Sequence, residues 1–177
     1  MSNTTTVILA AGKSSRFKAT TSKLIYPLCG LPIISHVYEI AKKISGKNVI
    51  VVCNKDNINE LKLILKDCIF IIQKHQKGTA DAIEQAKNKI NSKDVLILFG
   101  DTPLINLSSI KKLIKKFISS KVSASLIAFK TTQPFGYGRL ITKDGILQEI
   151  VEQINLKGDQ KKIKLCNSGI LIANKKI

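Results

Sequence analysis

Apolar runs of strand length alternate with amphipathic stretches of helix length along the first 130 residues, and this alternation constrains the fold most. β-branched runs predict strands, and apolar residues three and four positions apart predict helices. We expect strands at 5–9, 48–53, 68–73, 94–99 and 122–129, and helices at 32–44, 56–66, 79–90 and 107–118. Repeated strand–helix units form right-handed crossovers. The pattern therefore predicts a mostly parallel sheet with helices on both faces.

The pattern changes after residue 130. Three short strands are expected in the stretches GRLIT, DGILQEIVE and CNSGILIA, with a turn at Lys143-Asp144-Gly145 and a polar insert at 155–164. They predict an antiparallel element added to the sheet edge. The 177 residues are enough for one domain with a hydrophobic core. We expect one domain over 1–177, an α/β protein of Rossmann-like three-layer α/β/α architecture.

The composition excludes several classes of protein. Apolar residues make up 44% and charged residues 23% of the chain, as in globular domains. No apolar run approaches the roughly 20 residues that span a bilayer, and the N-terminus lacks the features of a signal peptide. The four cysteines form no CxxC pair and no zinc-ligand spacing. We expect a cytoplasmic protein with reduced thiols and no membrane partner.

The formal charge of +17 raises the question of nucleic-acid binding. Only Arg16 and Arg139 among the 29 basic residues are arginines, the residue type that makes bidentate base and phosphate contacts. The lysines are spread along the whole chain. We therefore favour a solvated lysine surface with no nucleic-acid partner, whose field attracts small anionic substrates.

The stretch VILAAGKSSRFKATTSK, residues 7–23, follows the first strand. It is no Walker A loop, because Val7 stands where that motif needs glycine, and it contains no GxGxxG. The small residues Ala10, Ala11 and Gly12 allow phosphate oxygens to approach backbone N–H groups. Arg16 and Lys23 can neutralise the charge. The stretch is a candidate phosphate-binding loop.

Two further loops follow strands, where ligands bind in open α/β sheets. In VLILFGDTPLI, a buried strand leads into Asp101, whose carboxylate can hold Mg²⁺ against substrate phosphates. In QKHQKGTADAIEQA, the carboxamide of Gln73 can pair with the O4 and N3–H edge of uracil. Gly78 permits close approach of a base, and Thr79 offers a hydroxyl and a helix cap. The second helix is expected to be capped by Asp56.

These motifs together resemble the signature of the sugar nucleotidyltransferases. The segments LAAGKSSRF, SKLIYPLCGLPII, PFGYGRLITKDGILQEIVEQ and NSGILIAN are similar to those of bacterial N-acetylglucosamine-1-phosphate uridylyltransferase domains. The resemblance implies UTP and N-acetylglucosamine 1-phosphate as substrates, Mg²⁺ as cofactor, and a role in supplying UDP-N-acetylglucosamine for peptidoglycan and lipopolysaccharide. It implies Arg16 and Lys23 as catalytic residues and Asp101 as metal ligand. The implied substrate-binding residues are Leu9, Ala10, Ala11, Gly12, Lys23, Gln73, Gly78, Thr79, Gly138, Glu152 and Asn167.

The chain departs from that family in three respects. Ser14-Ser15 stands where the family usually has Gly-Thr, and Phe99 where it often has Tyr. The resemblance also implies a longer domain, with a late Asn that completes the metal site, and a following β-helix acetyltransferase domain. Three alternatives remain open: a cytidylyl- or guanylyltransferase of another phosphorylated small molecule, a non-catalytic nucleotide-binding remnant, and charge-driven nucleic-acid binding. The oligomeric state is undetermined.

Overall fold

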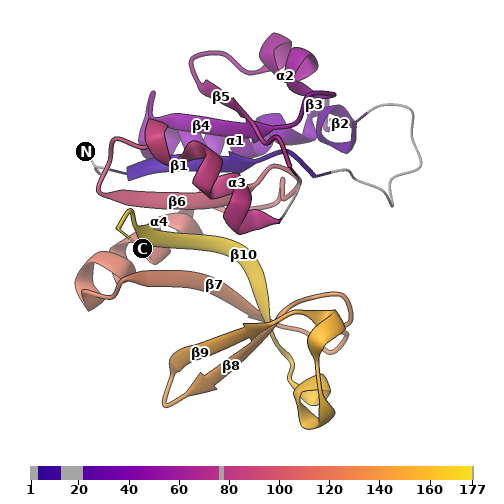
Figure 1. Ribbon diagram of the computed structural model, residues 1–177, viewed down its shortest axis with the longest axis vertical. Coiled ribbons are helices and arrows are strands. Elements are labelled where there is room, and N and C mark those ends of the chain that lie inside the picture. Colours follow the sequence, from indigo (N-terminus) through magenta and orange to yellow (C-terminus); the bar gives the residue numbers. More distant parts are fainter. Residues whose placement is uncertain (1–3, 13–21, 76–77, 177) are drawn as a thin grey trace. The chain divides into compact units, whose positions relative to one another are not determined.

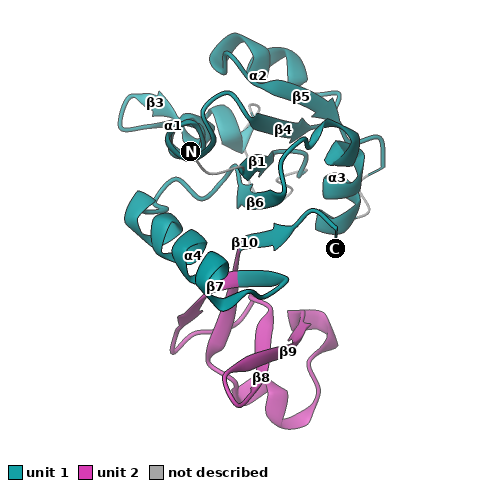
Figure 2. Cartoon of the chain, turned by 90° about the vertical axis from the view of Figure 1, so that its left-hand side faces the viewer, with its two compact units in different colours: residues 1–125, 171–177 teal, residues 126–170 magenta. Residues whose placement is uncertain are grey.

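A computed structural model describes residues 4–12, 22–75 and 78–176, which form two compact units (Figure 2). The first unit comprises residues 1–125 and 171–177, and the second comprises residues 126–170. Two strands, β7 (Ala124–Lys130) and β10 (Leu165–Asn174), have residues in both units. The helices of the described residues are all too short or too polar to cross a membrane.

The first unit contains a sheet in the order β5-β4-β1-β6, with all neighbours parallel (Figure 1). The last residues of β10, 171–174, pair antiparallel with β6. The prediction of a parallel core with an added antiparallel edge is therefore confirmed. The strands are β1 (Thr4–Leu9), β4 (Val49–Cys53), β5 (Ile69–Ile72) and β6 (Asp94–Phe99), and a small hairpin is formed by β2 (Pro27–Leu28) and β3 (Leu31–Pro32).

Helices cover both faces of this sheet, as the crossover argument predicts. In Figure 2, α1 and α4 lie on one side of the strands and α3 lies on the other. Alternate strand residues face α3, and Val7, Ile50 and Ile97 pack there with Ala82 and Ala86 of that helix. The helices are α1 (Ile33–Ser45), α2 (Ile58–Ile64), α3 (Thr79–Ala86) and α4 (Leu107–Ser120), with 3₁₀ turns at Lys23–Ile25 and Lys87–Lys89.

Two expected helix caps are wrong. The helix that was expected to be capped by Asp56 has Asn57 at its N-cap, and the Oδ1 atom of Asn54 accepts from the backbone N–H groups of Asp56 and Asn57. Thr79 is the first residue of α3, whose N-cap is Gly78, and no side-chain cap is formed. Spacing alone did not distinguish the capping residue from its neighbours.

The second unit is built from an antiparallel hairpin, β8 (Arg139–Lys143) and β9 (Ile146–Val151), and from parts of β7 and β10. The predicted turn lies between β8 and β9, where Asp144 and Gly145 both adopt positive φ. Cys166 of β10 pairs with Arg139 of β8. A 3₁₀ turn at Gln153–Asn155 leads into the polar insert, and a second one at Gly158–Lys162 lies within it.

Candidate active site

The carboxyl ends of β1 and β6 lie at one edge of the sheet. The loop that follows β1, called the β1 loop, and the loop with Asp101 that follows β6 therefore begin side by side. Leu9 lies beside Phe99 in the parallel register, and the backbone N–H of Gly100 donates to the Leu9 carbonyl at 2.9 Å. Ala10–Gly12 and Asp101 follow directly. A Cβ atom at Gly100 would lie 3.3 Å from both the Leu9 carbonyl oxygen and the Leu24 Cδ2 atom. The glycine therefore allows the two loops to approach closely.

Lys23 and Asp101 meet at this edge. The Lys23 Nζ atom donates to the Asp101 Oδ2 atom at 3.0 Å, and the two side chains are 37% and 41% exposed. Lys23 begins a 3₁₀ turn, and the Ser22 hydroxyl accepts from the Leu24 N–H at its start. An ion pair this exposed is worth about 0–1 kcal/mol. An incoming phosphate or cation can therefore replace either partner at little cost.

Asp101 is suited to bind a cation that phosphate oxygens also hold. It is less suited to a cation held by protein side chains alone. Among the described residues, no three His, Cys, Asp or Glu side chains gather to form a metal cage. Mg²⁺ needs only one or two carboxylates when phosphate oxygens and waters complete its octahedral shell. The single accessible carboxylate of Asp101 fits that requirement.

A pocket of about 330 Å³ opens at the same edge. Its lining combines small side chains with polar groups from three segments of the chain. Six of the residues expected to bind substrate line it, together with Ala82: Leu9, Ala11, Gly12, Gln73, Gly78 and Thr79. Gly78 has φ +102°, which side chains with a Cβ rarely adopt. The structure thus brings the β1 loop and the loop that follows β5 around one cavity. This agrees with the expectation that ligands bind at the carboxyl ends of the strands.

The carboxamide of Gln73 is held in one orientation. Its Nε2 atom donates to the Gly78 carbonyl at 3.1 Å and to the Asp81 Oδ2 atom at 2.6 Å, and the side chain is buried. Both N–H donors are therefore engaged within the protein. A base that contacts Gln73 would donate its ring N–H to the Oε1 atom, whereas the expected contact to uracil O4 lacks its donor. The sequence gives no signal for Asp81, because an acidic residue in a first helical turn is ordinary.

The side chains of two buried asparagines donate hydrogen bonds to backbone carbonyls of the β1 loop. Asn57 Nδ2 donates to the Ala10 carbonyl at 2.8 Å, and Asn54 Nδ2 donates to the Ala11 carbonyl at 3.2 Å. Asn57 Oδ1 also accepts from the Asn54 backbone N–H at 3.1 Å. Fixing these carbonyls fixes the peptide planes of the phosphate-binding candidate. Asn54 directly follows β4, so the strand-end rule could have identified it, and Asn57 comes three residues later, at the N-cap of α2.

The remaining expected substrate residues form a separate group in the second unit. The Asn167 backbone N–H donates to the Gly138 carbonyl at 2.9 Å. A Cβ atom at Gly138 would lie 3.1 Å from the Glu152 Oε1 atom, so this carboxylate rests against the glycine. Arg16 lies outside the described residues. The structure therefore places the predicted residues that it describes in two sets, one in each compact unit.

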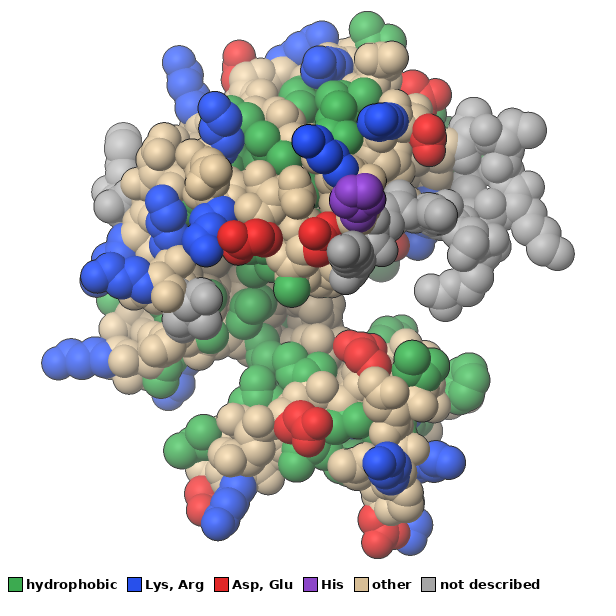
Figure 3. Space-filling model, viewed as in Figure 1, with side chains coloured by type: hydrophobic (Ala, Val, Ile, Leu, Met, Phe, Trp, Pro, Cys, Tyr) green, Lys and Arg blue, Asp and Glu red, His purple; other side chains and the backbone are tan. Residues whose placement is uncertain are grey.

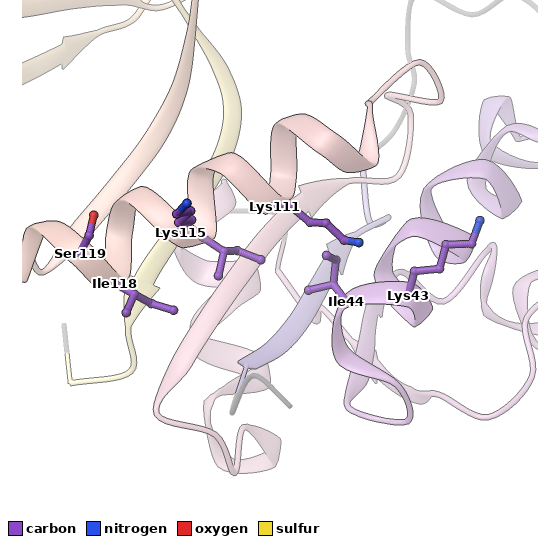
Figure 4. A pocket seen from close by; sticks show the side chains of 7 residues that line it. Lys43, Ile44, Lys111, Lys115, Ile118 and Ser119 are labelled. Atoms are coloured by element: carbon purple, nitrogen blue, oxygen red, sulfur yellow. The ribbon is translucent and has the colours of Figure 1, made fainter.

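A larger cavity of about 510 Å³ lies between α1 and α4 (Figure 4). Its lining combines three apolar and three basic side chains: Ile44, Ile114, Ile118, Lys43, Lys111 and Lys115. Lys43 and Ile44 belong to the last turn of α1, whereas ligands in such sheets bind beyond the strands' carboxyl ends. On the face shown in Figure 3, basic side chains are scattered over the surface. Three lysines at this groove therefore identify no particular ligand.

Comparison with known proteins identifies the family. The model of the MobA-like NTP transferase domain matches residues 6–165. The bifunctional protein GlmU of Buchnera aphidicola subsp. Schizaphis graminum is 42% identical over 174 residues, which cover 96% of this chain and 37% of that protein. The chain thus spans less than two fifths of this relative's length.

Two solved structures share the fold. A Bacillus anthracis protein, provisionally named a glucose-1-phosphate thymidylyltransferase, matches 98% of this chain and 72% of its own with a TM-score of 0.85 and 18% identity. A CMP:2-keto-3-deoxy-manno-octonic acid synthetase matches 99% and 75% with a TM-score of 0.76 and 19% identity. Their names refer to different nucleotides, so the shared fold does not decide the base. From the family match over most of its length, this chain belongs to the MobA-like NTP transferase domain family.

Proposed function

We propose that this chain transfers UMP from UTP to N-acetylglucosamine 1-phosphate, with release of pyrophosphate. The observation that carries the proposal is the meeting of Lys23 and Asp101 at 3.0 Å, at the sheet edge where the β1 loop ends. A cationic and an anionic group at one point suit a magnesium–triphosphate, which presents both charges. The similarity to the GlmU protein of Buchnera supports this reading.

The proposed reaction is an in-line displacement at the α-phosphorus of UTP. A phosphate oxygen of the sugar phosphate attacks, a P–O bond forms, and the bond to the bridging oxygen of pyrophosphate breaks. The attacking oxygen is already anionic, so no general base and no covalent intermediate are required. Bound Mg²⁺ would neutralise charge on the phosphate oxygens, with Asp101 as its protein ligand.

The chain's own residues would position the substrates and stabilise charge. Lys23 would leave Asp101 and contact the α-phosphate, where negative charge develops, together with Arg16 of the same loop. The backbone N–H of Gly12 would donate to a phosphate oxygen, whereas the Ala10 N–H already donates to the Val52 carbonyl at 2.7 Å. Gln73 and Gly78 would contact the uracil ring, and Gly138, Glu152 and Asn167 would bind the sugar. Mutual orientation and electrostatic stabilisation then supply the rate enhancement.

The direct test measures pyrophosphate release by the purified chain with UTP, N-acetylglucosamine 1-phosphate and Mg²⁺. Removing Lys23 or Asp101 should lower kcat/KM by about 10²–10³-fold, the usual cost of losing one charge-stabilising group. Lys112→Ala, on the exposed side of α4, is the matched control and should retain full activity. Wild-type kcat/KM in Lys23→Ala would refute the role of Lys23.

The same preparation separates the alternatives. Equal competition by CTP or GTP would favour another nucleotidyltransferase. Mg²⁺-dependent UTP binding without turnover would favour a nucleotide-binding remnant. Tight RNA or DNA binding that falls steeply with salt would favour the charge-driven alternative.

A further inference from the structure

Arg139 is a buried cation in the second unit without a carboxylate partner among the described residues. The side chain is 2% exposed, and none of the ion pairs found there includes it. Its Nη1 atom donates to the Tyr137 carbonyl, its Nη2 atom donates to the Gln153 Oε1 atom at 2.9 Å, and its Nε atom is buried without a partner in that part of the chain. A buried charge with incomplete pairing adds little to stability. Its contacts therefore suggest a role in positioning.

These contacts join two segments that are distant in sequence. The Gln153 Oε1 atom also accepts from the backbone N–H of Gly136 at 3.0 Å. Arg139 and Gln153 thus connect residues 136–137, which lead into β8, to the 3₁₀ turn that follows β9. The Tyr137 ring packs edge-on against Phe129 of β7, with centroids 4.9 Å apart, which adds a contact to the same loop.

The connected segments contain the sugar-side residues of the proposed site. Gly138 lies between Tyr137 and Arg139, and Glu152 immediately precedes Gln153. The Glu152 Oε1 atom lies 3.1 Å from the place of a Cβ on Gly138, so a small movement of either segment changes the space between them. The Gly138 carbonyl in turn accepts from the backbone N–H of Asn167. All three sugar-side residues therefore depend on how these segments are joined.

We propose that Arg139 and Gln153 form a clamp that positions Gly138 and Glu152 to bind the hydroxyl groups of the sugar phosphate. The proposal rests on the proposed function and assigns the clamp to sugar recognition. Arg139 is a positioning residue, because it acts through Gly138 and Glu152. The nucleotide-side residues belong to the other compact unit. Loss of the clamp should therefore weaken sugar-phosphate binding and leave nucleotide binding almost unchanged.

Arg139→Met tests the clamp, because methionine retains much of the buried stem and removes the donors. Calorimetry would measure binding of UTP with Mg²⁺, and then of N-acetylglucosamine 1-phosphate to enzyme saturated with an α,β-methylene analogue of UTP. We expect the sugar-phosphate Kd to rise about tenfold or more, the equivalent of roughly one hydrogen bond. The Kd for UTP should change by less than about twofold, a smaller effect on binding than the loss of one hydrogen bond. Gln153→Ala should reproduce this split, and Arg139→Lys should restore part of the affinity.

Amide hydrogen exchange gives a readout that does not need substrate. Exchange of the Gly136 N–H should accelerate in Arg139→Met. The Gln153 Oε1 atom, which accepts from that N–H, would no longer be held by its second hydrogen bond, from Arg139. Lys143→Met, at the exposed end of β8, is the matched control and should alter neither exchange nor affinity.

The outcomes separate the clamp from the proposed function. Unchanged sugar-phosphate affinity in Arg139→Met, beside measurable wild-type binding, overturns the clamp. Failure of the wild type to bind the sugar phosphate refutes the proposed function instead. In that case Gly136 exchange decides whether Arg139 and Gln153 hold the two segments together: faster exchange in Arg139→Met supports this positioning, and unchanged exchange overturns it.

Discussion

Asn57→Ala should destabilise the protein more than its single small side chain suggests. Asn57 is 4% exposed, and its carboxamide makes two hydrogen bonds inside the fold: one to the Ala10 carbonyl at 2.8 Å and one from the Asn54 N–H at 3.1 Å. The substitution removes both bonds and leaves a buried carbonyl and a buried N–H without partners. It also removes one of the two amides that hold the β1 loop.

The magnitude follows from the two abandoned groups. Each buried polar group left unsatisfied costs about 1–3 kcal/mol, and a water molecule that enters the vacated space recovers part of that cost. We therefore expect a loss of about 2–4 kcal/mol in the free energy of unfolding, or roughly 5–15 °C in Tm for a chain of this length.

Urea unfolding followed by far-UV circular dichroism measures this loss directly. Asn59→Ala is the matched control, since Asn59 is exposed two residues further along α2 and alanine is the better helix former. Its stability should stay the same or rise slightly. If Asn57→Ala lost less than about 0.5 kcal/mol, the lower limit for one net hydrogen bond, the argument that the two asparagines hold the loop would be wrong.

Three further predictions concern individual positions. Gly100→Ala should cost about 1–2 kcal/mol in urea unfolding, because its Cβ would crowd the Leu9 carbonyl at 3.3 Å, and an unchanged midpoint would contradict that close approach. Gly78→Ala should cost about 1–3 kcal/mol through strain at φ +102°, with no steric clash, and a stability equal to wild type would show that the loop relaxes. Burial raises the pKa of the Cys53 thiol from 9.0 to about 11, so this thiol loses its proton at a lower pH in the unfolded chain than in the folded protein. The stabilisation from this thiol should be complete below pH 9, and the free energy of unfolding should fall by about 2–3 kcal/mol as the pH rises to 11. Cys53→Ala should reduce this fall. Cys29→Ala, at an exposed cysteine, should leave the fall unchanged.

Local sequence information was sufficient for the parallel core. The predicted strand at 94–99 coincides with β6, and the helix at 107–118 is α4 extended by two residues. Such long periodic segments are specified by which residues must be buried. The helix expected at 79–90 is shorter, because α3 ends at Ala86 and continues as a 3₁₀ turn. Boundaries and caps depend on which hydrogen-bond acceptors lie nearby, and spacing contains little of that information.

The sequence alone determined which residues stand at the carboxyl ends of the strands, because strand order along the chain and hydrophobic periodicity are local properties. It therefore placed Gly12, Gln73 and Asp101 at one edge of the sheet. Only the tertiary structure decided which side chains meet there: Lys23 contacts Asp101, and Asp81 orients Gln73.

The same distinction holds for the residues that support the site. Asn57 reaches back across 47 positions to the Ala10 carbonyl, and Arg139 joins Tyr137 to Gln153. A hydrogen bond of this kind requires a donor and an acceptor at about 3 Å with defined angles. Those distances exist only after the chain has folded, so the sequence can mark a polar residue near a strand end but not the acceptor that it meets.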